Sequence, residues 1–118
     1  MVRPSLLDEI AMMAVSVARR LIAEERLVRG IKRPEARTII AREAGLAPGS
    51  LENLERGRLK NVDRIAASLH ALLARKIERR IASLQHELFL IRQTGRADPA
   101  DLERAEAALQ EAQRALGK

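Results

Sequence analysis

The chain has 118 residues and a formal net charge of +6, a length that suits one compact domain or a small domain with an extension. It contains no cysteine, which excludes a disulfide framework and a thiolate metal site, and its single aromatic residue, Phe89, excludes a row of rings for stacking single-stranded bases. Alanine, leucine, arginine and glutamate dominate, and no segment alternates apolar and polar residues, so the sequence predicts an all-α protein.

The first predicted element is a long helix that begins near Ser5 and ends at Gly30. Ser5 and Asp8 have the spacing of a capping box, with aspartate in the place of the usual glutamate. The uncharged run 10–18 is too short to span a bilayer, and Asp8 and Glu9 precede it where a secretory signal carries positive charge, so we expect a cytoplasmic protein without membrane contact. Four apolar residues at helical spacing form a face that packs either inside the monomer or against a second subunit: Ile10, Met13, Val17 and Leu21.

Two short helices separated by a tight turn follow, over residues 34–57. Pro34 suits the first position of the first helix, which we expect to end near residue 44. Ala41 is small enough for a steep helix crossing, and Gly45 tolerates the positive φ that a reversal of the backbone favours. Two leucines three residues apart then hold the second helix to the core: Leu51 and Leu54.

The start of the second helix is open to two interpretations, because the sequence at 47–50 is Ala-Pro-Gly-Ser. Either Pro48 is the first helical residue, or Ser50 caps a shorter helix that begins at Leu51. We favour the Pro48 start, which predicts a helix over 48–57.

The longest predicted helix begins at Val62, with Asn61 as its N-cap, and stops at 93–95. Its first part supplies apolar residues that complete the small helical core: Ile65, Leu69, Leu72 and Leu73. Farther along, apolar residues recur at alternating spacings of four and three, the pattern of a coiled-coil seam: Ile77, Ile81, Leu84, Leu88 and Ile91. Asp98 and Pro99 then start a last helix, whose apolar residues have similar spacing: Leu102, Ala105, Leu109, Ala112 and Leu116.

These two helices predict a C-terminal antiparallel coiled-coil hairpin over 74–118, which follows a helical domain over 1–73. The whole long helix that begins at Val62 is nearly twice as long as the last helix, so part of its seam has no cover within the chain. A second subunit is the expected cover. The sequence therefore predicts a homodimer, with contacts from Leu84, Leu88 and Ile91.

Positive charge is concentrated in the middle of the chain. Residues 19–80 contain sixteen Lys and Arg against eight Asp and Glu, a net charge of +8, whereas 1–18 and 81–118 each have a net charge of −1. The basic excess coincides with the two short helices, as expected of a surface that binds phosphates.

Residues 41–57 resemble the helix-turn-helix of the lambda-repressor-like (Xre-type) DNA-binding regulators. The ending Leu54-Glu55-Arg56-Gly57, followed by Asn61 and the apolar positions Ile65, Leu69 and Leu72, is similar to the passage from the third to the fourth helix of that family. The resemblance covers residues 34–73, about a third of the chain, and includes neither the long N-terminal helix nor the C-terminal hairpin.

The resemblance implies a bound DNA duplex, with the helix 48–57 in the major groove and the preceding helix across the backbone. In this arrangement Arg37 and Thr38 contact phosphate groups. Further backbone phosphates are expected to contact three basic residues: Arg56, Arg58 and Lys60.

Few side chains of this helix offer hydrogen bonds to base edges, and those that do are Ser50, Glu52 and Asn53. Asn53 can pair with N6 and N7 of adenine. Glu52 either accepts from N4 of cytosine or, as we favour, pairs with Arg56 four residues along the helix. Sequence preference would then rest on few base contacts together with DNA shape.

Other chemistries have little support in the sequence. The two histidines, His70 and His86, are sixteen residues apart on one predicted helix and cannot share a metal ion. There is no Gly-rich phosphate loop, no nucleophile with a base and no converging carboxylate pair, so we expect no enzyme activity, catalytic residue, metal, cofactor or small-molecule substrate.

We therefore expect a homodimeric transcriptional regulator that prefers particular double-stranded DNA sequences, with repression as its simplest mode of action. Two alternatives stay open. One is a helical adaptor whose hairpin docks a protein partner, and the other is an architectural, replication or transfer accessory DNA-binding protein of a mobile element.

Overall fold

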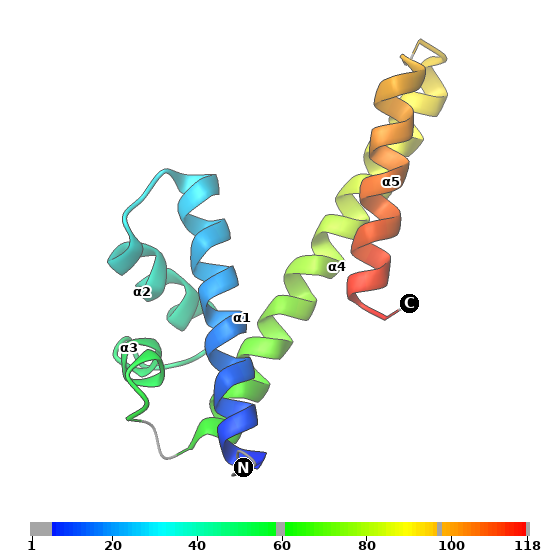
Figure 1. Cartoon of the computed structure of the whole chain (residues 1–118). Coiled ribbons are helices and arrows are strands. Elements are labelled where there is room, and N and C mark those ends of the chain that lie inside the picture. Colours follow the sequence, from blue (N-terminus) through cyan, green and yellow to red (C-terminus); the bar gives the residue numbers. More distant parts are fainter. Residues whose placement is uncertain (1–5, 59–60, 97, 118) are drawn as a thin grey trace. The chain divides into compact units, whose positions relative to one another are not determined.

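The computed structural model describes residues 6–58, 61–96 and 98–117, with side chains from Glu9 onward. The described residues form five helices and no strand, which confirms the predicted all-α class (Figure 1). The helices are α1 (Leu6–Arg29), α2 (Arg33–Glu43), α3 (Ser50–Glu55), α4 (Val62–Thr94) and α5 (Pro99–Ala115). The capping box predicted at Ser5 and Asp8 lies outside the described side chains.

The chain divides into two compact units, of which the first ends at Leu73 and the second begins at Ala74. In the N-terminal unit, α1, α2, α3 and the first part of α4 share one apolar core. Its largest fully buried side chains are Leu21, Ile22, Ile40, Leu51, Leu69 and Leu72. Burial of each such side chain contributes about 1.5–3 kcal/mol relative to exposure, so these contacts hold the short helices α2 and α3 against α1.

The face that α1 buries differs in part from the predicted one. Leu21 is fully buried as expected, but Met13 is 56% exposed and the other two predicted residues are only partly buried. Ala14 and Ala18 are fully buried instead. Small side chains at a contact let helix axes approach closely, so the face of α1 against the core includes alanines that a count of large apolar residues overlooks.

Two glycines end α2 and α3 in the same way. Gly45 has a φ of 73° and Gly57 a φ of 70°. After each glycine, the next N–H donates to a carbonyl in the last turn of the helix: Leu46 to Ala41 at 2.8 Å, and Arg58 to Asn53 at 2.9 Å. Both ends are Schellman motifs, in which a residue in the left-handed conformation lets the backbone close over the last carbonyls.

α3 begins at Ser50 and is six residues long, so the predicted start at Pro48 is wrong. The N–H of Ser50 donates to the carbonyl of Ala47 at 3.0 Å, and Gly49 has φ −82° and ψ −7°. These are the features of a type I turn over 47–50 with Pro48 in its second position, where proline is favoured. The proline therefore shapes the turn before the helix, and the Schellman motif at Gly57 ends the helix soon afterwards.

The C-terminal unit pairs the later part of α4 with α5, which lies beside it (Figure 1). The predicted start of α5 is confirmed, because Pro99 is its first residue and the carboxylate of Asp98 accepts from the N–H of Ala100 at 3.0 Å. Arg92 on α4 and Glu106 on α5 form an ion pair at 3.2 Å. The pair links the two helices near the end of α4.

Candidate nucleic-acid interface

α3 turns its leucines to the core and Asn53 outward. Leu51 and Leu54 are 0% and 3% exposed, whereas Asn53 is exposed and Ser50 is half-buried. The side chain of Asn53 forms no hydrogen bond with another described residue. Its amide therefore keeps a donor and an acceptor available for a ligand, which is what pairing with a base edge requires.

Glu52 and Arg56 form an ion pair on the surface of α3. Arg56 Nη2 lies 2.8 Å from Glu52 Oε1, and the two side chains are 57% and 44% exposed. This is the pairing that we favoured for Glu52 from the sequence. Because the pair is exposed it stabilises the fold little, but it leaves Glu52 less available to cytosine and Arg56 less available to phosphate.

Glu55, at the end of α3, binds two arginines at the start of α2. Arg33 Nη2 donates to Glu55 Oε2 at 2.5 Å, and Arg37 Nε lies 3.7 Å from Glu55 Oε1. The side chain of Glu55 is only 16% exposed and that of Arg37 only 21%. Both atoms of the longer pair are buried without a hydrogen bond, so it is a charge interaction across the helix contact.

We call these three side chains the Glu55 cluster: Arg33, Arg37 and Glu55. The cluster makes Arg37, a predicted phosphate contact on α2, less available to a phosphate. Arg37 is largely covered and faces a carboxylate, so it is not a free cation in this structure. The hydroxyl of Thr38 donates to the carbonyl of Pro34 at 3.0 Å, within its own helix. The sequence contains no local signal for the cluster, because Arg33 and Glu55 are 22 residues apart.

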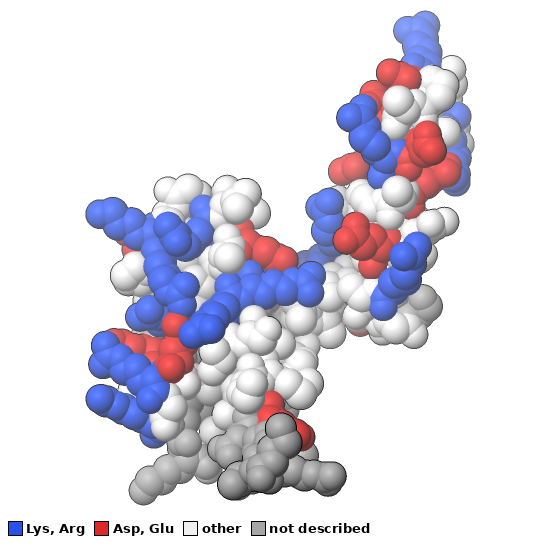
Figure 2. Space-filling model, in the orientation of Figure 1, with Lys and Arg blue, Asp and Glu red and all other residues white. Residues whose placement is uncertain are grey.

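Several other basic side chains of the N-terminal unit form neither an ion pair nor a side-chain hydrogen bond with a described residue: Arg19, Lys32, Arg42, Arg58 and Arg64. Of these, Arg58 alone is a phosphate contact predicted from the sequence. Lys60, another predicted contact, lies outside the described residues. Figure 2 shows Lys and Arg gathered over the side of this unit that α2 and α3 form, with carboxylates between them.

The residues expected at a dimer contact are buried in the C-terminal unit to different extents. Leu84 and Leu88 are 6% and 4% exposed in the single chain, whereas Ile91 is half-buried. The large apolar side chains that the C-terminal unit leaves exposed are Phe89 and Leu90, at 57% and 48%. Phe89 and Leu90, and not Leu84 or Leu88, are therefore the accessible large apolar side chains of this part of α4.

Other kinds of site are not evident among the described residues. They contain no group of three or more His, Asp or Glu side chains that could hold a metal ion, and none of their helices is both long and apolar enough to cross a membrane. His70 and His86 are both exposed on α4. Comparisons with protein families, with curated proteins and with solved structures found no match to this chain.

Proposed function

We propose that this protein binds double-stranded DNA with a preference for particular sequences and acts as a homodimeric transcriptional regulator. The proposal is supported above all by the face that α3 turns outward, where the side-chain amide of Asn53 is exposed and forms no hydrogen bond with another described residue. Arg42, before α3 in the chain, and Arg58, after it, are also exposed, and neither side chain pairs with a described residue. In this view α2 and α3 are a helix-turn-helix of the lambda-repressor-like kind, and α3 is the recognition helix.

The connection between α2 and α3 supports this interpretation. Ala41 is fully buried in the core next to Ile40, so α2 and α3 can cross closely, and Gly45 supplies the left-handed residue in the turn. Leu51 and Leu54 hold α3 against the core through one face only. The opposite face is then free to enter a groove about 12 Å wide.

The recognition surface is small. A helix of six residues is about 9 Å long at 1.5 Å per residue, and the Glu52–Arg56 pair occupies two of its polar side chains. Asn53 is the expected direct base contact, through N6 and N7 of adenine, with Ser50 as a second hydrogen-bonding group. The remaining preference would come from DNA shape and from the spacing of two half-sites.

Phosphate contacts are assigned to the basic side chains in and next to α2 and α3 that have no partner among the described residues. Lys32, Arg42 and Arg58 replace Arg37 and Arg56 in this role, because the latter two face carboxylates. Each phosphate contact releases counterions and makes the affinity depend on salt. Arg37 instead acts indirectly, by fixing α2 against the end of α3.

A homodimer is part of the proposal because one short recognition helix offers few base contacts. Two copies on a two-fold symmetric site would double those contacts, with half-sites about one helical turn apart. Phe89 and Leu90 in the C-terminal unit are the exposed apolar side chains that a second subunit would cover.

Selection of bound sequences from a random duplex library tests the proposal directly. We expect an enriched, roughly two-fold symmetric site whose half-sites contain adenine, and a binding constant for that site well above the constant for random duplex at the same salt. A ratio near one would instead favour the architectural or accessory DNA-binding alternative, and no binding to duplex at low salt would favour the adaptor.

A further inference from the structure

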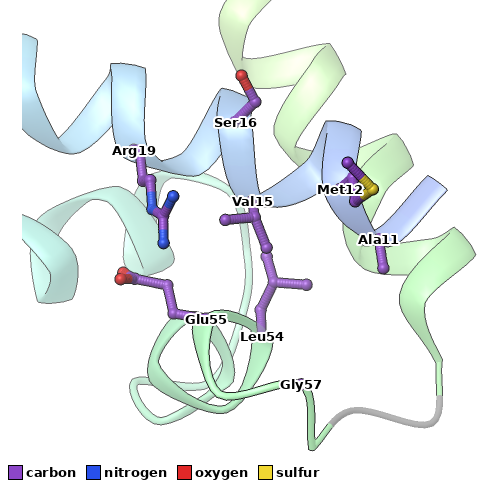
Figure 3. A pocket seen from close by; sticks show the side chains of 8 residues that line it. All are labelled: Ala11, Met12, Val15, Ser16, Arg19, Leu54, Glu55 and Gly57. Atoms are coloured by element: carbon purple, nitrogen blue, oxygen red, sulfur yellow. The ribbon is translucent and has the colours of Figure 1, made fainter. Parts of the chain in front are cut away.

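A pocket of about 410 Å³ lies between α1 and α3 in the N-terminal unit (Figure 3). Apolar side chains form most of its lining: Ala11, Met12 and Val15 from α1, and Leu54 from α3. Its volume falls within the range of small-molecule sites, which is about 300–1,000 Å³. Met12 is 68% exposed at its edge, where a long unbranched side chain can adapt to different ligands.

One end of the pocket is polar. Figure 3 shows Arg19 from α1 and Glu55 from α3 extending toward each other at that end, with Ala11 and Met12 at the other. Arg19 forms no ion pair with a described residue, while Glu55 already binds Arg33 and Arg37. Arg33 and Arg37 bind the carboxylate toward which Arg19 extends, so the three arginines and Glu55 together have a net charge of +2.

The positive charge at one end of the pocket and the apolar side chains along the rest of it together indicate the chemical class of ligand. An apolar body would cover Val15 and Leu54, and an anionic group beside Arg19 would offset part of the positive charge at the polar end. Arginine binds a carboxylate through two parallel hydrogen bonds, which suits a planar anion in a pocket of this size. A nucleic-acid backbone has the charge but no apolar body to fill the rest of the space.

We propose that this pocket binds a small organic carboxylate with an aliphatic or aromatic body, with the carboxylate on Arg19 and the body between α1 and α3. Because Leu54 and Glu55 belong to the same helix as Asn53, the bound ligand would be an effector of DNA binding. This effector role rests on the proposed function, whereas the binding of the ligand does not.

The binding experiment uses the full chain without DNA and three probes of equal length: hexanoate, 1-hexanol and hexylammonium. We expect hexanoate to bind most tightly, and its titration to move the backbone amide resonances of Val15, Arg19, Leu54 and Gly57 more than those of the C-terminal unit. Equal binding of the three probes, or resonance changes spread over both units, would contradict the proposal.

Two variants locate the site, and a third controls for charge. Arg19→Gln should weaken hexanoate binding about tenfold, the size of a lost hydrogen bond to a charged group, while leaving 1-hexanol binding unchanged. Ser16→Phe places a ring at an exposed position of the pocket wall and should block every probe. Arg20→Gln removes the same charge from the next residue, which pairs with Glu24 outside the pocket, and should bind hexanoate as the wild type does.

DNA affinity with and without saturating hexanoate then tests the effector role. We expect a change for the wild type and for Arg20→Gln, and none for Ser16→Phe. If hexanoate binds but leaves the DNA affinity of the wild type unchanged, the effector role is wrong. If Arg19→Gln lowers DNA affinity without ligand and binds hexanoate normally, Arg19 is a phosphate contact and the proposed ligand site is wrong.

Discussion

Arg37 Nε and Glu55 Oε1 face each other at 3.7 Å across the contact between α2 and α3, and both atoms are buried without a hydrogen bond. The second oxygen of the same carboxylate accepts from Arg33. One acidic side chain thus joins the start of one helix to the end of the next. The arginine that the sequence assigned to a phosphate is therefore part of the fold.

Glu55→Gln should destabilise the N-terminal unit by about 1–3 kcal/mol, because two guanidinium groups lose their carboxylate while one stays largely buried. Chemical denaturation followed by circular dichroism measures the change. Glu52→Gln is the matched control, since it breaks an exposed pair on the same helix and should cost less than about 1 kcal/mol. Equal effects of the two substitutions would show that the Glu55 cluster has no special role.

Gly45→Ala should destabilise the protein by about 1–2 kcal/mol, because φ at this position is 73° and an L side chain is strained there. The strain is in the backbone, since a Cβ at this position meets nothing within 4 Å.

Gly49→Ala is the control for that substitution and should have the opposite sign. Its φ is −82°, and the added Cβ would meet only Asn53 Nδ2, at 4.0 Å. We expect a gain of about 0.4–1 kcal/mol from the lower entropy of the unfolded chain. If both substitutions moved the thermal midpoint in the same direction, the opposite signs of φ at Gly45 and Gly49 would be contradicted.

Asn53→Ala and Arg58→Ala should change DNA binding in different ways. Loss of Asn53 removes a base contact, so it should cost about 1–3 kcal/mol on the selected site and relax the preference for adenine. Loss of Arg58 should weaken binding to all sequences and reduce the salt slope by about one. Arg96→Ala, at an exposed position of the C-terminal unit, is the control for net charge and should change neither property.

Leu88→Ala should destabilise the C-terminal unit by about 2–5 kcal/mol, because Leu88 is 4% exposed in the single chain. Leu90→Ala, two residues along α4 and 48% exposed, should cost much less. Amide hydrogen exchange in α5 distinguishes the two substitutions, because only Leu88→Ala should accelerate the exchange. Equal exchange rates in the two variants would mean that the packing of α5 against α4 does not depend on Leu88.

Self-association is best tested at Phe89 and Leu90, because a charge at the buried Leu84 or Leu88 would first disrupt the packing of the C-terminal unit. The double substitution Phe89→Asp and Leu90→Asp should lower the dimer fraction in analytical ultracentrifugation while the helical content stays the same. A wild-type chain that is monomeric at micromolar concentration would refute the homodimer.

Features set by neighbouring residues follow from the sequence alone. The all-α class comes from helix-forming composition, the end of α2 from Gly45, and the start of α5 from Asp98 and Pro99. The Glu52–Arg56 pair is local in the same sense, because residues four apart on a helix are neighbours. Such features depend on backbone preferences within a few residues, so a linear sequence contains them.

The tertiary structure decided the properties that depend on contacts between distant residues. Which face of α1 is buried depends on how the other helices of the N-terminal unit pack against it, and this packing brings Ala14 and Ala18 into the core and leaves Met13 exposed. Glu55 pairs with Arg33 and Arg37 because folding brings the end of α3 to the start of α2. The sequence predicted a basic surface around two short helices. Which of its arginines pair with a carboxylate, and which are left to bind a phosphate, follows only from the folded structure, because an ion pair depends on the distance between two side chains in space.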